Sequence, residues 1–180
     1  MRARAALLTL LSCGVMTAGC GDDQPSGSEI AVPSTVALTS TAFGDGGEIP
    51  VRFTCDGAGM SPPLVWKDGD RTASAWALVV DDPDAPGGTF VHWVLLDIPP
   101  ATRSVGTGAE PAGAAQAENS EGQAGYTPPC PPSGRHHYRF TVYGLRSPTG
   151  LADGVSLKRA LDAIGSAAVE RGRLVGTYER

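Results

Sequence analysis

The stretch Ser74-Ala-Trp-Ala-Leu-Val-Val-Asp81 decides the fold of this chain. Its side chains are almost all apolar at both odd and even positions, as in a strand that is covered on both faces. Phe90–Ile98 has the same character and ends at Pro99-Pro100. His137–Leu145 is a third strong strand, in which apolar and polar side chains alternate. The sequence therefore predicts a mainly β protein built around these strands.

Weaker patterns surround this centre. Residues 35–41 and 49–54 are predicted to form short strands on either side of the turn Gly44-Asp-Gly-Gly47. Residues 101–125 contain few large apolar side chains and are predicted to form a long irregular loop. Residues 174–178 are predicted to form a closing strand or an extended tail.

One helix is convincing, from Leu157 to Arg171. Its apolar residues recur at helical spacing, Ser156 is a plausible N-cap, and Gly172 can end it in a left-handed conformation. Strands thus dominate and the only clear helix comes late, which is typical of a β-sandwich and not of a βαβ fold. We predict one domain over residues 35–180: an antiparallel β-sandwich with one main C-terminal helix and long irregular loops.

The N-terminus has the pattern of a targeting segment. Residues 1–19 have a basic start, an apolar run too short to span a bilayer, and small residues before Cys20. This is typical of a bacterial lipoprotein signal, with Cys20 as the acylated residue and residues 20–34 as a flexible tether. The alternative is an ordinary secretory signal cleaved near Ala18. Either way the protein is expected to be exported, and in the first case held at the cell envelope only through its lipid anchor.

Composition limits the partners. The chain has 180 residues and a formal net charge of −5, which argues against nucleic-acid binding and against an electrostatic attachment to anionic lipid. After export, Cys13 leaves with the signal and Cys20 carries the lipid, so Cys55 and Cys130 remain. Two cysteines in an oxidising compartment suggest a disulfide, with two free thiols as the alternative.

Titratable side chains stand where Pro-rich turns join the strands. His136 and Tyr138 share one side of their strand, about 7 Å apart, because alternate residues face the same way. Asp82 continues the side of its strand that carries Trp76, Leu78 and Val80. His92 is assigned to the side that carries Phe90, Val94 and Leu96, and is therefore expected to point inward. If the strands are neighbours, these four side chains form one pocket suited to a small polar or anionic headgroup.

Each of these residues also has a plainer interpretation. An inward His is usually a satisfied core residue, Asp-Pro-Asp is usually turn chemistry, and a strand Tyr usually packs with its hydroxyl bonded. The combination is more specific than its parts.

Several motifs resemble, in the same order, those of the phosphatidylethanolamine-binding protein family, whose bacterial branch is often called Raf kinase inhibitor-like. They are Thr54-Cys55-Asp56-Gly57, Ser61-Pro62-Pro63-Leu64, Asp82-Pro83-Asp84-Ala85-Pro86, His92-Trp93, Pro129-Cys130-Pro131-Pro132 with Gly134, His136-His137-Tyr138 and Leu174–Tyr178. The resemblance covers residues 35–180. It implies a β-sandwich with a small pocket for phosphate or phosphorylated headgroups, lined by Asp82, Pro86, His92, His136 and Tyr138, with Pro131 in one wall.

Two departures from the family pattern involve three positions. Thr127 and Pro128 replace the usual glycines before Pro-Cys-Pro-Pro, and Pro128 has no N–H with which to hold an anion. His137 replaces the usual Arg and is expected to change the rim of the pocket or a salt bridge, and not the pocket floor.

We therefore expect a binding protein for a small anionic or phosphorylated ligand, with no cofactor. One alternative is an inhibitor or scaffold that acts on an external protease or kinase-like partner. A metal- or acid–base-dependent hydrolase is a further alternative, but the sequence contains no complete catalytic motif, so no catalytic or metal-binding residue is assigned.

Overall fold

The computed structural model describes residues 30–67, 69 and 71–180. The predicted signal peptide, the lipidation at Cys20 and most of the tether lie outside these residues. No helix within them is long and apolar enough to cross a membrane.

The described residues form a mainly β fold with two sheets. The elements in chain order are β1 (Leu38–Thr39), β2 (Gly47–Glu48), a 3₁₀ helix (Val51–Phe53), β3 (Leu64–Trp66), β4 (Ala75–Asp82), β5 (Phe90–Ile98), β6 (Ser104–Val105), β7 (Ala115–Gln116), β8 (Arg135–Leu145), α1 (Leu157–Ala167) and β9 (Ala168–Glu179). The large sheet has the strand order β2-β9-β8-β4-β5-β7, and the small one β1-β3-β6. All neighbours are antiparallel except β2 and β9, which are parallel.

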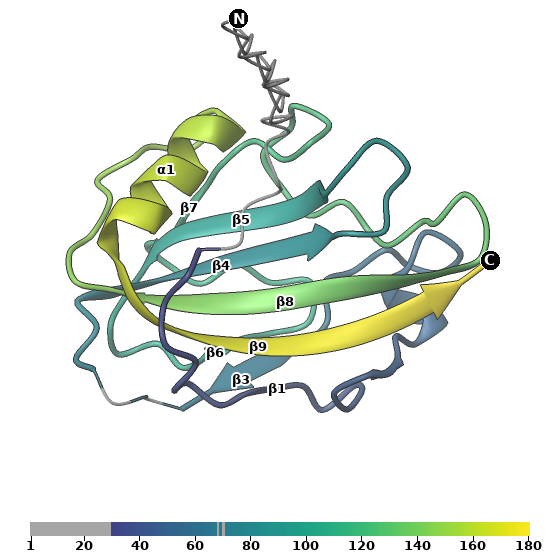
Figure 1. Cartoon of the computed structure of the whole chain (residues 1–180), viewed down its shortest axis with the longest axis horizontal. Helices are drawn as coiled ribbons and strands as arrows, with labels where there is room; N and C mark the ends of the chain where they lie inside the picture. Colours follow the sequence, from purple (N-terminus) through teal and green to yellow (C-terminus); the bar gives the residue numbers. More distant parts are fainter. Residues whose placement is uncertain (1–29, 68, 70) are drawn as a thin grey trace, which may run out of the picture.

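The large sheet is covered on both faces (Figure 1). One face packs on the small sheet through a core rich in aromatic residues, and the other packs on α1 through smaller side chains. Every residue of β4, the strand first singled out in the sequence, is buried. This explains why its apolar residues do not alternate with polar ones.

The helix is shorter than predicted. It ends at Ala167, and Ala168 is already extended and begins β9. Ser156 makes no side-chain capping hydrogen bond, and Gly172 lies inside β9 and not at the helix end. A Cβ at Gly172 would collide with the carbonyl oxygen of Val36, so this glycine allows two chain segments to approach closely.

Of two further predicted strands, one is absent and the other is shorter than predicted. Residues 49–54 contain a 3₁₀ helix and not a strand, and the strand predicted over 35–41 is reduced to the two residues of β1. Between these two segments, Gly47 and Glu48 form β2, which pairs with β9.

The packed region begins before residue 35. The side chains of Ile30 and Val32 pack against the core beneath α1. The carbonyl oxygen of Pro33 accepts a hydrogen bond of 2.9 Å from the amide of Arg171. Residues 30–34, predicted as the end of the tether, are therefore docked on the domain.

Candidate functional site: a pocket at one edge of the large sheet

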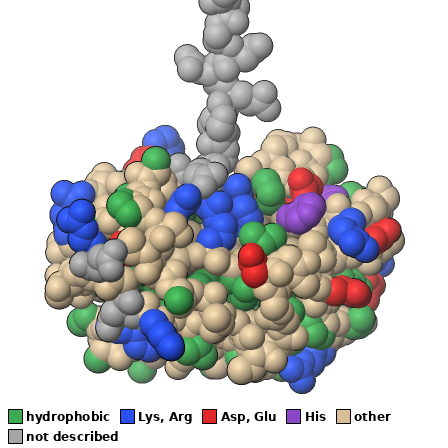
Figure 2. All heavy atoms as spheres, turned by 60° about the horizontal axis from the view of Figure 1, so that its bottom comes forward, with side chains coloured by type: hydrophobic (Ala, Val, Ile, Leu, Met, Phe, Trp, Pro, Cys, Tyr) green, Lys and Arg blue, Asp and Glu red, His purple; other side chains and the backbone are tan. Residues whose placement is uncertain are grey.

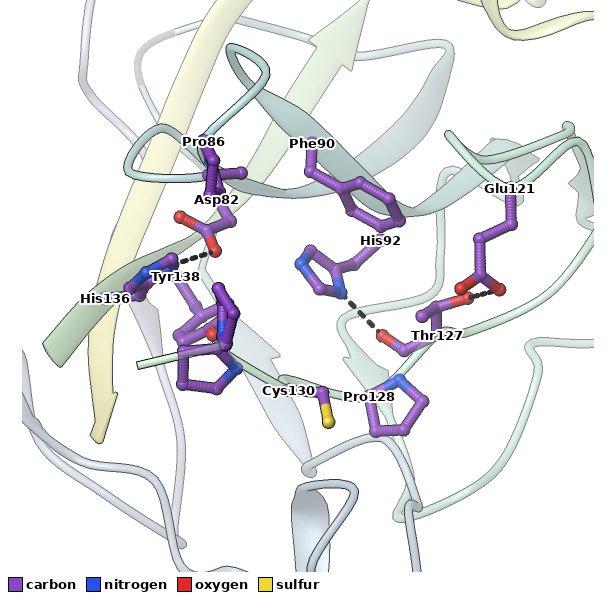
Figure 3. A pocket seen from close by; sticks show the side chains of 13 residues that line it. Asp82, Pro86, Phe90, His92, Glu121, Thr127, Pro128, Cys130, His136 and Tyr138 are labelled. Carbon is purple, nitrogen blue, oxygen red and sulfur yellow. Dashed lines mark hydrogen bonds and ion pairs between the residues drawn. The ribbon is translucent and has the colours of Figure 1, made fainter. Parts of the chain in front are cut away.

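A cavity of about 220 Å³ opens where β4 ends and where β5 and β8 begin (Figure 3). These ends meet because β4 is antiparallel to both neighbours. The cavity is lined by Asp82, Ala85, Pro86, Phe90, His92, Glu121, Thr127, Pro128, Cys130, Pro131, Pro132, His136 and Tyr138. All six residues proposed from the sequence as ligand contacts are among them.

Asp82 and His136 form a buried pair across two neighbouring strands. The Nδ1 atom of His136 lies 2.7 Å from Oδ2 of Asp82, and the side chains are only 8% and 5% exposed. The other carboxylate oxygen of Asp82 accepts a hydrogen bond of 2.8 Å from the amide of Asp84, which follows it in the turn. Both carboxylate oxygens are thus engaged, and the imidazole is held in one orientation before any ligand arrives.

His92 reaches the pocket through a β-bulge. Val80 pairs with Trp93 and Asp81 pairs with Val91, so His92 is an extra residue without a partner on β4. A bulge of this kind redirects a side chain. The result is that His92 and Trp93 both turn toward the small sheet, whereas Val94 and Leu96 pack beneath α1. The inward orientation predicted for His92 is present, but its assignment to the side of Val94 and Leu96 was wrong.

The ring of His92 is fixed by the loop that follows residue 125. Its Nδ1 atom lies 2.8 Å from the carbonyl oxygen of Thr127, and the amide of Thr127 donates a 2.9 Å hydrogen bond to the carbonyl oxygen of His92. Since a carbonyl oxygen can only accept, Nδ1 carries a proton. The Nε2 atom is buried and has no hydrogen-bond partner among the described residues. Burial lowers the pKa of His92, although the bond to Thr127 and the nearby Asp82 partly oppose this.

Tyr138 forms part of the pocket floor. Its ring centroid lies 5.3 Å from that of His92 and 6.5 Å from that of His136. The hydroxyl group is buried without a hydrogen-bond partner in the described part of the chain. Burial, followed by the Asp82 carboxylate, raises the pKa of Tyr138, so the phenol keeps its proton. The pocket therefore contains a hydrogen-bond donor that lies near the Asp82 carboxylate but has no partner at hydrogen-bond geometry among the described residues.

A disulfide holds the Pro-rich wall of the pocket. Cys55 and Cys130 are bonded, with Cα atoms 5.4 Å apart. The amide of Cys55 also donates a 3.0 Å hydrogen bond to the carbonyl oxygen of Pro129. The side chain of Arg180 contacts both the sulfur of Cys130, at 3.3 Å, and Asp56, at 3.1 Å. The segments around Cys55 and Arg180 thus support the wall from behind.

The two departures from the family pattern, at Thr127-Pro128 and at His137, have separate effects. The amide of Thr127 is already bonded to His92, and Pro128 has no N–H, so neither offers a backbone donor to a ligand. His137 lies outside the pocket and forms a 2.7 Å pair with Asp84, with the two side chains 54% and 40% exposed. Figure 2 shows histidine at the surface of the protein beside an acidic side chain. Burial would raise the pKa of Asp84, but the hydrogen bonds from His137 outweigh it and lower the pKa.

Sequence reasoning missed the acidic rim of the pocket. Glu121 lies in the irregular loop before the Pro-rich segment and accepts a 3.0 Å hydrogen bond from the hydroxyl of Thr127. Phe90 was assigned to the strand but not to the site, and its ring lies 4.7 Å from that of His92. No periodic pattern or motif marks Glu121.

The lining of the pocket contains no Lys or Arg side chain. Within the described residues, no group of three or more His, Cys, Asp or Glu side chains is arranged to hold a metal ion.

Comparisons with known proteins agree with this architecture. The family model described as phosphatidylethanolamine-binding protein matches residues 39–179. A Mycobacterium tuberculosis protein named "Putative lipoprotein LppC" is 41% identical over 98% of this chain and 94% of its own length. A protein of Methanothermobacter thermautotrophicus named "UPF0098 protein" is 40% identical over 79% of this chain and 98% of its own length.

Solved structures are similar as well. The Chlamydia trachomatis protein CT736, described as a homologue of phosphatidylethanolamine-binding proteins, superposes with a TM-score of 0.76 at 36% identity and covers 82% of this chain and 99% of its own. Escherichia coli YbcL, described as a member of the mammalian family of that name, also has a TM-score of 0.76, at 26% identity and the same coverage. From the matched residues, the shared fold and these relatives, we conclude that the chain belongs to the phosphatidylethanolamine-binding protein family.

Proposed function

We propose that this protein is a lipid-anchored binding protein of the cell envelope whose pocket takes phosphate-type anions or phosphorylated headgroups. The observation that carries the proposal is the convergence of Asp82, His92, His136 and Tyr138, from three strands, around one cavity. Asp82, His92 and His136 are fixed by their own hydrogen bonds and the ring of Tyr138 is fixed by burial, so little conformational entropy is lost when a ligand binds. The hydroxyl of Tyr138 can donate a hydrogen bond to a ligand oxygen. Because Nδ1 of His136 is bound to Asp82, Nε2 of His136 can donate to the ligand only when the ring carries two protons.

Binding is favoured over catalysis by the state of the candidate nucleophiles in the lining. The sulfur of Cys130 is in a disulfide, and the hydroxyl of Thr127 donates to Glu121. The buried Asp82–His136 pair could orient a general base, but the groups beside it are better suited to holding a ligand than to attacking one.

Calorimetry with inorganic phosphate and with phosphoethanolamine tests the pocket, and the two neighbouring histidines of β8 provide a matched pair of variants. His136→Ala removes a buried group from the pocket, whereas His137→Ala removes an exposed group outside it. Loss of a hydrogen bond to a charged ligand costs roughly 1.5–3 kcal/mol, so we expect His136→Ala to weaken binding about ten- to a hundredfold. His137→Ala should bind as the wild type does. If both variants bind as tightly as the wild type, the pocket is not the binding site for these anions.

The envelope location is supported by the mycobacterial relative, because its similarity extends over 98% of this chain and it is named as a lipoprotein. Expression of the full chain in a bacterium with lipoprotein processing, followed by membrane fractionation, tests this part. The wild type should sediment with membranes and Cys20→Ala should not. A wild-type protein that remains in the soluble fraction would contradict the anchor.

A further inference from the structure

Two buried polar atoms of the pocket lack partners, and they are of opposite kinds. Among the described residues, neither Nε2 of His92 nor the hydroxyl of Tyr138 makes a hydrogen bond. His92 is 5% exposed and Tyr138 is fully buried. Buried polar groups are normally paired, and the exceptions point to a ligand or to strain. These two side chains lie together, with ring centroids 5.3 Å apart, in the lining of one cavity.

The geometry fixes which of them accepts a hydrogen bond. The Nδ1 atom of His92 donates to the carbonyl oxygen of Thr127 at 2.8 Å, so in the neutral ring the lone pair is on Nε2. Burial lowers the pKa of this imidazole, which favours the neutral ring. In Figure 3 the ring edge away from Thr127 faces the side of the pocket with Asp82 and Tyr138. Besides the Asp82–His136 pair, the pocket therefore presents an unused acceptor, His92, and an unused donor, Tyr138.

The other groups in the lining reinforce the need for a donor on the ligand. Each oxygen of Asp82 has one partner, Asp84 or His136, and each retains a further lone pair. Glu121 adds a second carboxylate at the rim. The lining residues include no Lys or Arg. An anion with only acceptor oxygens would face these lone pairs without a compensating Lys or Arg, whereas an anion that carries a proton can donate it to one of them.

We infer that the pocket selects an oxyanion that keeps its own proton, such as hydrogen phosphate, over an oxyanion of equal shape and charge that has none, such as sulfate. This inference rests on the proposed function, because it concerns the ligand of the same pocket. Tyr138 donates to an unprotonated phosphate oxygen, and the P–OH group donates to Nε2 of His92, so both orphaned atoms are satisfied by one tetrahedral group. A phosphodiester, as in an intact phospholipid headgroup, has no such proton, so its affinity should be as low as that of sulfate.

Phosphate and sulfate form a matched pair of probes. Both are tetrahedral, both are dianions at about pH 8, and only phosphate retains a proton. Calorimetric titration of the wild-type protein at that pH should give a phosphate affinity at least about tenfold higher than that for sulfate, because sulfate leaves a buried acceptor unpaired. Dimethyl phosphate, a diester, should bind no better than sulfate. If sulfate or dimethyl phosphate binds as tightly as phosphate, the inference is wrong while the proposed function stands. If none of the three binds, both are wrong.

Two variants assign the selectivity to its residues. His92→Asn retains an amide that can donate to Thr127 and removes the Nε2 acceptor, so the ratio of phosphate to sulfate affinity should fall severalfold toward one. Tyr138→Phe removes a donor that both anions use, so both affinities should fall and the ratio should remain. A ratio that is unchanged in His92→Asn, or lost in Tyr138→Phe, would contradict the assigned roles. The wild-type ratio remains decisive if a variant fails to fold.

The protonation of His92 distinguishes this mechanism from simple attraction to a positive charge. In ¹⁵N NMR spectra of the imidazole rings, the Nε2 atom of His92 should remain without its own proton in the phosphate complex and show the shift of a hydrogen-bond acceptor. A ring that becomes doubly protonated when phosphate is added would mean that the anion binds an imidazolium. That result would overturn the inference.

Discussion

Replacing Tyr138 by Phe removes one hydroxyl group from the floor of the pocket and leaves the aromatic ring in place. The hydroxyl is buried and makes no hydrogen bond within the described residues, so the ligand-free protein bears its desolvation cost without compensation. A buried polar group in this state costs roughly 1–3 kcal/mol. Tyr138→Phe should therefore raise the free energy of unfolding of the ligand-free protein, by about 1 kcal/mol at the lower end of that range. For a domain of this size, such a gain raises Tm by about 2–4 °C.

The same substitution should weaken ligand binding. The lost hydrogen bond to the charged anion is worth roughly 1.5–3 kcal/mol, or about a ten- to a hundredfold rise in the Kd for phosphate. Stability and affinity thus move in opposite directions, as expected of a residue retained for function at the expense of stability. A group whose role is purely structural would not behave in this way.

Tyr178→Phe is the matched control. The hydroxyl of Tyr178 donates a 2.7 Å hydrogen bond to Asp56, so its removal should lower stability by roughly 0.5–1.5 kcal/mol and change phosphate affinity little. Urea denaturation gives the stability and calorimetry gives the Kd. A Tyr138→Phe variant that is less stable than the wild type and binds phosphate equally well would refute the reasoning, because it would mean that the hydroxyl is satisfied within the protein.

Three further predictions follow from the fold and its charges. The Cys130→Ser variant should lose about 4 kcal/mol of unfolding free energy, the chain-entropy value for a sequence separation of 75 residues, and an unchanged urea midpoint would contradict this. Burial lowers the pKa of His92, so the unfolded chain takes up a proton at a higher pH than the folded protein does. The free energy of unfolding should therefore fall as the pH drops below about 6.5. This fall should be less steep in the His92→Asn variant. Gly172→Ala should cost about 1–3 kcal/mol or more in denaturation experiments, because its Cβ meets the carbonyl oxygen of Val36, and a neutral effect would mean that β9 can shift.

The centre of the fold was predictable because its strands have strong patterns. The observed β4 and β5 begin and end within one residue of the predicted strands, and β8 begins only two residues earlier than predicted. Their apolar runs are long, and prolines or turns mark their ends. The prediction that His136 and Tyr138 lie on the same side of β8 was also correct. The register between β4 and β8 has no shift, so the residues of β8 alternate regularly between the two faces of the sheet.

Strand β9 was not predictable in full because its inward face has little hydrophobic signal. The positions opposite Val142 and Tyr138 are Gly172 and Gly176. A Cβ at Gly176 would approach the side chain of Ile49 to 2.6 Å, so the packing requires glycine where a pattern search expects an apolar residue. The preceding residues continue the helical period of α1, which explains why the helix was extended too far.

The site was only partly predictable for a similar reason. The motifs placed Asp82, His92, His136 and Tyr138 together, but the bulge at His92 follows from the register between β4 and β5, which no local pattern reveals. Glu121 comes from an irregular loop whose path depends on tertiary contacts. The amide of Thr127 donates to the carbonyl oxygen of His92, and this contact between distant segments could not be predicted either.

The three histidines of the chain allow the most direct test of the pocket. His92 and His136 line it, and His137 is exposed outside it, so each ring reports on a different position. In an NMR titration of the wild-type protein with inorganic phosphate, the imidazole signals of His92 and His136 should shift together with one Kd, while those of His137 stay in place. If phosphate shifts only His137, or shifts none of the three rings, the pocket does not bind phosphate-type anions and the central claim is contradicted.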